Sequence, residues 1–552
     1  MTSSWKGIAE AKRNAVISKI PPQWRLDAIP SAESEPNCLE ILLNLCTPFE
    51  LEIANSTVKK LSQDIAAGKY TSLSVTQVFC KRAAYLHQLT NCCSEIFFER
   101  AIDKAKELDQ IFSKTKKVVG PLHGIPISLK DQLNIEGLDS AIGYVELVNK
   151  PIEKGEVSNL VRILEGLGAI LFVKTTVPMA MMSPETVSNV YGRTVNSINR
   201  MVSCGGSSGG EGALVGGRGA LLGFGTDIGG SIRIPSGAQG LYGLRCSSNR
   251  IPYCKISNSM KNAPIHCSVV GPMAVDLQDL KFIVKLILET NPWVDDPKCP
   301  PIPWREVNAN EKAIFGYIDI TSLSYVHPPV KRAMKEAKEA LIKSGHEVVS
   351  ITPPTSLLDL AAVSTKILLA DGFKEIAEEC KKSGEPIRSE ILGLDENEGL
   401  PQESTISEYF NNCGKLYEFQ QEFDTYLKHS GSLTISGKPI DAFFLPIQTC
   451  SAFKPGDSDI FSVFCTQVFN LLDYSVVTVP VTVSDQEVDF FEESYNPLNK
   501  MDEKRWKYYD PKLCHGSPIG IQVVSSRYGE EMAIAMAEVV SESLAVFHKA
   551  SH

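Results

Sequence analysis

A glycine-rich stretch from Cys204 to Arg245 most constrains what this chain of 552 residues can fold into. It reads CGGSSGGEGALVGGRGALLGFGTDIGGSIRIPSGAQGLYGLR and holds Ser207, Ser208 and Ser231, with a Gly-Gly pair before Ser207 and before Ser231. Glycine lets the backbone take positive φ or pass close to another group. Backbone amides can therefore crowd around a reacting atom, and the stretch predicts a site for a negatively charged oxygen.

Three other interpretations of this stretch compete with an oxyanion site. A flexible Gly/Ser linker does not fit the interleaved apolar residues, such as Ala213-Leu214-Val215, which favour burial. A phosphate-binding loop lacks the Gly-Lys-Ser/Thr that should follow it. A nucleophile elbow remains open, because Gly205-Gly206-Ser207-Ser208-Gly209 satisfies G-x-S-x-G. In that case Ser207 would attack, with a later histidine such as His266 or His515 as its base.

Two segments of the stretch carry a family resemblance. GGSSGGEGAL and GFGTDIGGSIRIPSGAQGLYGLR, at the separation they have here, resemble the signature of the amidase signature family. This family consists of serine hydrolases that use a Ser-Ser-Lys triad in place of Ser-His-Asp. The resemblance extends from about Ser56 to the C-terminus and implies neither a metal nor a cofactor.

A separate segment from Gly120 to Asp131 reads GPLHGIPISLKD and resembles the part of the family that supplies the catalytic lysine. Apolar residues alternate with Ser128 and Lys130, as in a strand that runs into a site. Burial lowers a lysine pKa by several units, so Lys130 becomes a competent base only if it is desolvated. Asp131, next along the strand, is expected to point to the opposite face and not to raise that pKa.

The resemblance also assigns roles to individual residues. It implies that Ser231 attacks the substrate, that Lys130 is the base, and that Ser207 passes the proton between them. The residues expected at the substrate and the oxyanion hole are Met181, Ser207, Ile228, Gly229, Gly230 and Ser231, and those expected to hold the loop are Ser208, Thr226, Asp227 and Arg233.

Composition excludes some functions and indicates a compartment. A net charge of -10 leaves no basic excess to neutralise phosphates, which disfavours a nucleic-acid partner. It also disfavours a transamidating subunit that acts on charged tRNA. Fifteen scattered cysteines without C-x-x-C spacing are expected to be buried thiols in a reducing cytoplasm. No apolar run has the length of a transmembrane segment, so no integral membrane segment is expected.

Helix-glycine-strand units, such as the one from Val157 to Val173, predict an α/β fold. We expect a single amidase-signature domain, residues 56–552, in which helices cover both faces of a large mixed β-sheet. Residues 1–55 are expected to form a helical arm packed on this body, and 356–439 a mostly helical cover over the site entrance. Ser74, with Gln77 three residues later, predicts the start of a helix that extends to about Gln88.

The arm and the segment ETVSNVYGRTVN, Glu185 to Asn196, resemble fungal acetamidase-type enzymes. This implies an amidohydrolase that cleaves short-chain or aromatic carboxamides through an acyl-enzyme on Ser231. A fatty-acid amide hydrolase of the same family is the main alternative. A catalytically silent binding protein is a weaker one, because all three triad positions are occupied. A homodimer is compatible with the sequence, which does not determine the acyl length.

Overall fold

The computed structural model describes residues 4–261, 263–307, 312–391 and 399–551. Within these residues one sheet of eleven strands has the order β1-β3-β2-β6-β8-β7-β12-β13-β11-β9-β10. Parallel pairs join β2 to β3 and β6, and β9 to β10 and β11. The remaining pairs of this sheet are antiparallel. The predicted single α/β domain with a large mixed sheet is confirmed.

The strands of this sheet are short and mostly buried. Their bounds are β1 Cys93–Ile96, β2 Pro126–Lys130, β3 Ile170–Thr175, β6 Leu222–Asp227, β7 Tyr242–Arg245, β8 Val269–Ala274, β9 Ile314–Tyr317, β10 Glu347–Ser350, β11 Ala442–Pro446, β12 Ser475–Val483 and β13 Pro518–Ser525, and a separate hairpin contains β4 Val187–Ser188 and β5 Gly192–Arg193.

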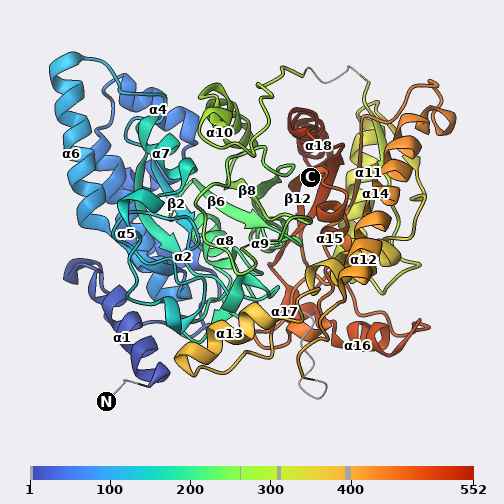
Figure 1. Cartoon of the computed structure of the whole chain (residues 1–552). Helices are drawn as coiled ribbons and strands as arrows, with labels where there is room; N and C mark the ends of the chain where they lie inside the picture. The colour runs from blue at the N-terminus through green and yellow to red at the C-terminus, as the bar shows by residue number, and fades with distance from the viewer. Residues whose placement is uncertain (1–3, 262, 308–311, 392–398, 552) are drawn as a thin grey trace.

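Helices cover the sheet from two sides, and Figure 1 shows α10 and α18 above the strands and α8 and α9 below them. The bounds of the helices are α1 Trp5–Ser18, α2 Cys38–Leu45, α3 Pro48–Ala54, α4 Val58–Ala66, α5 Ser72–Thr90, α6 Phe98–Thr115, α7 Asn159–Gly166, α8 Gly209–Gly216, α9 Arg233–Gln239, α10 Leu277–Glu289, α11 Pro328–Lys343, α12 Leu357–Leu368, α13 Lys374–Ser383, α14 Ile406–Lys428, α15 Phe464–Leu471, α16 Lys500–Tyr508, α17 Pro511–Cys514 and α18 Glu530–Ser551.

Local sequence explains where several elements begin and end. Gly168, at a φ of +94°, follows α7 and lets the chain turn directly into β3, as its position between an apolar-periodic segment and an apolar run predicts. The prediction that Ser74 opens the next helix is wrong by one turn. Thr71 is the N-cap of α5, and Ser74 is the third helical residue that completes its capping box.

Buried ion pairs connect the first helix, α1, to the rest of the protein. Lys12 of α1 contacts Glu95 of β1, and it lies 2.8 Å from the Asp139 carboxylate. The exposed fraction of each of these three side chains is 14% or less. Residues 1–3 of the predicted arm, and 392–398 of the predicted cover, lie outside the described residues.

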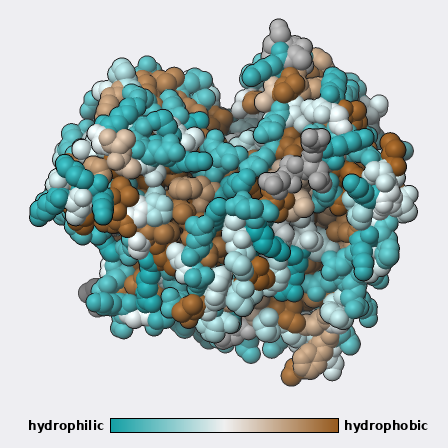
Figure 2. Space-filling model, turned by 90° about the horizontal axis from the view of Figure 1, so that it is seen from above, coloured by the Kyte–Doolittle hydropathy of each residue, from teal (hydrophilic) through white to brown (hydrophobic). Residues whose placement is uncertain are grey.

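Figure 2 shows hydrophilic residues interspersed with separate hydrophobic groups over the face seen from above. Of the helices within the described ranges, none has the length and apolar character needed to cross a membrane.

Candidate active site

The sheet brings the lysine strand and the glycine-rich stretch together. β2 lies parallel to β6, with Ser128 opposite Gly223, and both strands end at the same edge. Lys130 is the last residue of β2, and Asp227 is the last residue of β6. In open α/β sheets this carboxyl edge is where ligands bind. The turn after β6 carries Ser231, so Lys130 and Ser231 lie at the same edge of the sheet.

Lys130 is the centre of the hydrogen bonding at this edge. Its Nζ donates to Ser207 Oγ at 2.8 Å and to Thr226 Oγ1 at 2.7 Å. The Lys130 side chain has no exposed area. Burial lowers its pKa from the ordinary lysine range to about 7, although nearby carboxylates oppose the shift. A substantial fraction of this amine is therefore neutral at neutral pH.

A chain of side chains behind Lys130 fixes the direction of these hydrogen bonds. Gln132 donates its Nε2 to the Ser257 carbonyl and the Tyr253 hydroxyl, so its Oε1 faces Thr226. Thr226 donates to that oxygen at 2.5 Å and must accept from Lys130. A neutral Lys130 that donates one N–H to Thr226 can accept a proton from Ser207 on its lone pair. The orientation suits a base and not merely a structural cation.

Three buried carboxylates oppose the loss of charge at Lys130. Asp227 has the largest effect among them, followed by Glu211, and both raise the lysine pKa. Asp131 raises it as well, so the prediction that its charge would not act on Lys130 is wrong. Its carboxylate accepts from Ser94 and from the backbone N–H of Ile142, which identifies its structural role. Asp131 lies in the turn just after β2, and its effect on the Lys130 pKa is the smallest of the three carboxylates.

Asp227 organises the turn that carries Ser231. Burial alone would raise the pKa of Asp227. The Arg233 guanidinium donates two hydrogen bonds to this carboxylate and holds its pKa below the ordinary value. The same carboxylate accepts from the N–H groups of Gly230 and Ile232, at 2.9 and 3.1 Å. Because its N–H already donates to Asp227, Gly230 could serve an oxyanion only by sharing that hydrogen between two acceptors. The part of Gly230 in the predicted four-amide oxyanion hole stays a prediction.

The two glycines before Ser231 differ in their surroundings, and substitutions should separate them. A Cβ added at Gly229 would meet no atom within 4 Å. A Cβ at Gly230, where φ is +132°, would lie 2.8 Å from the Ile234 side chain and also contact Thr466. Gly230→Ala is therefore expected to lower the free energy of unfolding by about 2–3 kcal/mol, measured in urea.

Gly229→Ala is the matched control for that substitution. Its methyl group would enter the open side of the turn, where Gly229 lines a pocket together with Ser231. We expect normal stability and a kcat/KM that falls roughly a hundredfold, because the methyl group would occupy the pocket that Ser231 also lines. Equal stability losses in the two variants would contradict the difference in their surroundings.

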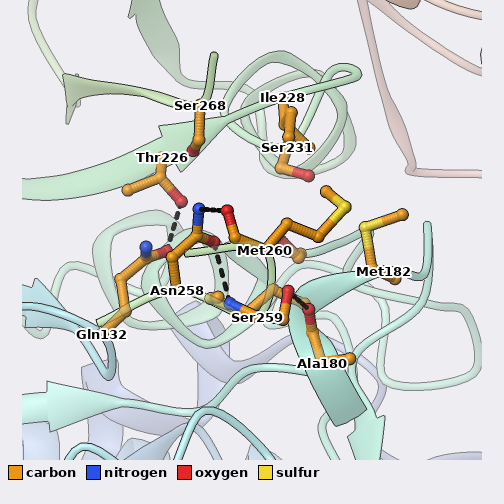
Figure 3. Close-up of a pocket in the computed structure, with 12 residues that line it drawn as sticks. Gln132, Ala180, Met182, Thr226, Ile228, Ser231, Asn258, Ser259, Met260 and Ser268 are labelled. Carbon is orange, nitrogen blue, oxygen red and sulfur yellow. Dashed lines mark hydrogen bonds between the residues drawn. The ribbon is translucent and has the colours of Figure 1, made fainter. Parts of the chain in front are cut away.

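Ser231 lies between a polar pocket and an apolar one. The polar pocket, with a volume of about 10 Å³, is lined by Ser207, Ser231 and Thr226 together with Asn258 and Ser268. Figure 3 shows the Met260 side chain extending across it toward Ser231 and Met182. The apolar pocket has a volume of about 30 Å³, and its lining includes Met181, Met182, Pro184, Ile234, Leu368 and Val463.

Met181 reaches both pockets from an unusual turn. Ala180 and Met181 take positive φ values of 58° and 59°, and the Ala180 carbonyl accepts from Ser259 at 2.6 Å. Non-glycine residues rarely adopt such angles, and backbone strain of this kind occurs often at ligand sites. Met181 therefore lines both pockets that Ser231 lines, and its contact with a substrate stays a prediction.

The nucleophile-elbow alternative finds no support in the histidine positions. His515 is half exposed near Asp485, and His266 pairs with Ser364 at 2.6 Å. Among the described residues, neither Ser207 nor Ser231 has a hydrogen bond to a histidine.

Ser208, predicted as a supporting residue, bridges the two segments. Its hydroxyl donates to the Thr226 carbonyl, its N–H donates to the Ser231 carbonyl, and Arg233 supports the same turn.

Sequence reasoning missed two polar residues of the site. Gln132 lies in the turn that follows β2, where Leu133 N–H donates to the Lys130 carbonyl, so strand alternation gave no signal for it. Glu211 stands within the quoted GGSSGGEG segment and is fully buried. Its carboxylate accepts from the hydroxyls of Ser128 and Thr175. Burial raises its pKa to about 7 despite these hydrogen bonds.

Comparison with known proteins places this site in a family. The amidase family model matches residues 74–534. An acetamidase of Aspergillus oryzae is 38% identical over 98% of this chain and 99% of its own length, and an acetamidase of Emericella nidulans is 38% identical over 99% of both chains. A solved fatty acid amide hydrolase structure aligns with a TM-score of 0.91 at 29% identity, covering 98% of this chain and 95% of that one.

Proposed function

This chain belongs to the amidase family and is an amide-hydrolysing enzyme, and we propose that it cleaves carboxamides through an acyl-enzyme formed on Ser231. The observation that carries the proposal is a fully buried lysine whose Nζ lies 2.8 Å from Ser207 Oγ, in the pocket that Ser231 also lines. A lysine of pKa about 7 in that place is suited to general-base catalysis at neutral pH.

In the first half of the proposed reaction, Ser231 Oγ forms a bond to the amide carbonyl carbon. Its proton passes to Ser207, which transfers its own hydroxyl proton to Lys130 Nζ. The backbone N–H groups of Ile228, Gly229 and Ser231 stabilise the resulting oxyanion, and losing one such donor typically costs about 3–4 kcal/mol of activation free energy.

In the second half, the carbon–nitrogen bond breaks and the leaving nitrogen takes a proton from Lys130 by way of Ser207. The products of this step are an ester on Ser231 and ammonia or an amine. Water then attacks the ester, and the same three residues carry its proton, which releases the carboxylate and regenerates Ser231. Asp227 and Arg233 keep the turn in place, and Thr226 holds the lysine.

The substrate class that we propose is a short-chain or aromatic carboxamide. The relatives named acetamidases, similar over nearly their whole length, support it. A fatty-acid amide is the alternative, favoured by the likeness to the fatty acid amide hydrolase structure. We further propose that the enzyme works in the cytoplasm, without a nucleic-acid partner. All fifteen cysteines are unpaired, as expected in a reducing compartment.

A fluorophosphonate probe tests the identity of the nucleophile, because it forms a covalent bond with an activated serine. After labelling and proteolysis, mass spectrometry is expected to find the adduct on Ser231. Labelling of the wild type should be blocked by substrate amides and should be strongly reduced in Lys130→Met. An adduct on Ser207 would instead identify Ser207 as the nucleophile and revive the elbow mechanism.

A further inference from the structure

The two pockets beside Ser231 differ in how they relate to Ser207. Ser207 itself lines the polar pocket, whereas its neighbour Gly206 lines the apolar one. In the proposed reaction the leaving nitrogen takes its proton by way of Ser207. That nitrogen must therefore face the polar pocket, and the acyl group is directed toward the apolar one.

The polar pocket has room for one small group. Its volume of about 10 Å³ corresponds to a single water-sized sphere, which is the least that a water molecule needs. Ser207, Ser231, Asn258 and Ser268 line it, and all four carry side chains that can form hydrogen bonds. The same place can therefore hold the departing ammonia and then the water that attacks the ester.

Met260 closes the polar pocket on the side of a second cavity. It lines both the polar pocket and this cavity, which has a volume of about 250 Å³. Its half-buried side chain packs against the apolar cluster that contains Met181 and Met182. Figure 3 shows the Met260 thioether beside Ser231 and Met182. A substituent on the leaving nitrogen that extends toward the second cavity would meet this thioether.

Hydrogen bonds fix the backbone that carries Met260. Ser259, only 3% exposed, donates its hydroxyl to the Ala180 carbonyl at 2.6 Å, and its N–H donates to Asn258 Oδ1 at 3.0 Å. Asn258 Nδ2 also donates to the Met260 carbonyl at 3.4 Å. A methionine side chain is flexible, but its backbone is held here. A substituent can therefore pass only if the side chain leaves its apolar contacts.

We propose that Met260 restricts the leaving group to ammonia, which makes the enzyme selective for primary carboxamides over N-substituted ones. The inference rests on the proposed amide hydrolysis and deepens it, because it names the class of amide and a residue that selects it. One methylene group more or less in a pocket changes kcat/KM by about 10- to 200-fold. A single methyl group on the amide nitrogen should therefore produce a measurable difference.

Acetamide and N-methylacetamide test the restriction, because both give acetate and they differ by one methyl group on nitrogen. In the wild type, kcat/KM for acetate release is expected to favour acetamide roughly a hundredfold. A preference of less than tenfold would overturn the proposal. The ratio of the two values is then compared between enzymes, so that the intrinsic reactivity of each amide cancels.

Met260→Ala removes the thioether and opens the polar pocket to the second cavity. It should lower the ratio of acetamide to N-methylacetamide kcat/KM at least tenfold, while Met260→Leu, with a side chain of similar volume, should keep the wild-type ratio. Leu368→Ala is the matched control, because Leu368 lines the second cavity and the apolar pocket. It should leave the ratio unchanged even where it changes both rates. A wild-type ratio in folded Met260→Ala, or an equal fall in Leu368→Ala, would contradict the role of Met260.

Acyl transfer to hydroxylamine tests the same pocket in the wild type. Hydroxylamine attacks the acetyl ester on Ser231, so a carbon–nitrogen bond forms as the ester carbon–oxygen bond breaks. A proton passes from the nitrogen to Ser231 Oγ by way of Ser207 and Lys130, and the product is acetohydroxamic acid. The attacking nitrogen must occupy the place of the leaving nitrogen, by microscopic reversibility. Hydroxylamine should therefore divert acetyl groups from acetate at least tenfold more effectively than N-methylhydroxylamine, and equal yields would overturn the proposal.

Protection of Ser231 from a fluorophosphonate probe needs no turnover, so it separates failure of this inference from failure of the proposed function. Stronger protection by acetamide than by N-methylacetamide, without acetate release from either, would reject the proposed function and support the restriction. Hydrolysis of both amides with similar kcat/KM would do the reverse. Equal protection without hydrolysis would reject both.

Discussion

Ser231→Ala is expected to reduce kcat/KM for amide hydrolysis by roughly 10⁴- to 10⁶-fold, the range seen when a serine nucleophile is removed from a hydrolase. The reason is chemical, because alanine offers no atom to form the acyl-enzyme. The residual rate would come from the oxyanion donors and from substrate binding. Steady-state kinetics with an aromatic carboxamide and a sensitive assay for released ammonia measure the effect.

The same variant should remain folded. Ser231 Oγ makes no side-chain hydrogen bond to another described residue, so its removal leaves no buried partner unsatisfied. Thermal unfolding of Ser231→Ala is therefore expected to match that of the wild type. Ser113→Ala, at an exposed position on α6, is the matched control and should retain wild-type kinetics. Near-normal turnover by folded Ser231→Ala would reject it as the nucleophile.

The sequence predicts helices and strands well where the hydrophobic periodicity agrees with the position of a helix-ending residue such as glycine. An apolar-periodic helix, a glycine and an apolar run predict α7 and β3, and the structure contains both. The start of α5 shows the limit of this reasoning. Thr71 and Ser74 both carry hydroxyls that can cap a helix, and only the tertiary position of the chain selects Thr71. The order of the strands depends on long-range pairing, which no local pattern contains.

The candidate site also has one part that the sequence predicts and another that depends on the fold. Lys130, Ser207 and Ser231 stand in recognisable motifs, and the structure brings Lys130 within hydrogen-bond distance of Ser207. The hydrogen bond between Thr226 and Gln132, and those of the buried Glu211 with Ser128 and Thr175, join residues that are distant in sequence and meet only in the folded sheet. The second cavity combines the chain before β8 with α12 and α13, so its existence could not be predicted from either segment alone.

The pH dependence of catalysis should report the protonation of Lys130. Because only the neutral amine can accept a proton, kcat/KM is expected to fall about tenfold per pH unit below a pKa near 7 and to level off above it. Lys130→Met, which removes the amine but keeps an unbranched apolar side chain, should lose activity to an extent comparable with Ser231→Ala. Whatever residual activity it has should lack this acid limb.

Glu211→Gln tests the electrostatic origin of that limb. Burial raises the pKa of Glu211 to about 7, close to that of Lys130, so the two groups titrate as a coupled pair in the wild type. The Glu211 carboxylate raises the lysine pKa, and its neutral amide replacement should therefore move the acid limb of kcat/KM to lower pH.

Glu385→Gln is the matched control for this substitution. Glu385 is also a buried carboxyl with a raised pKa, but its partners are the Val145 N–H and the Asn189 amide, and it has no resolved effect on Lys130. Its variant should keep the wild-type limb. A limb that stays in place or moves to higher pH in folded Glu211→Gln would mean that the titrating base is not Lys130, because removing a nearby negative charge can only favour the neutral amine.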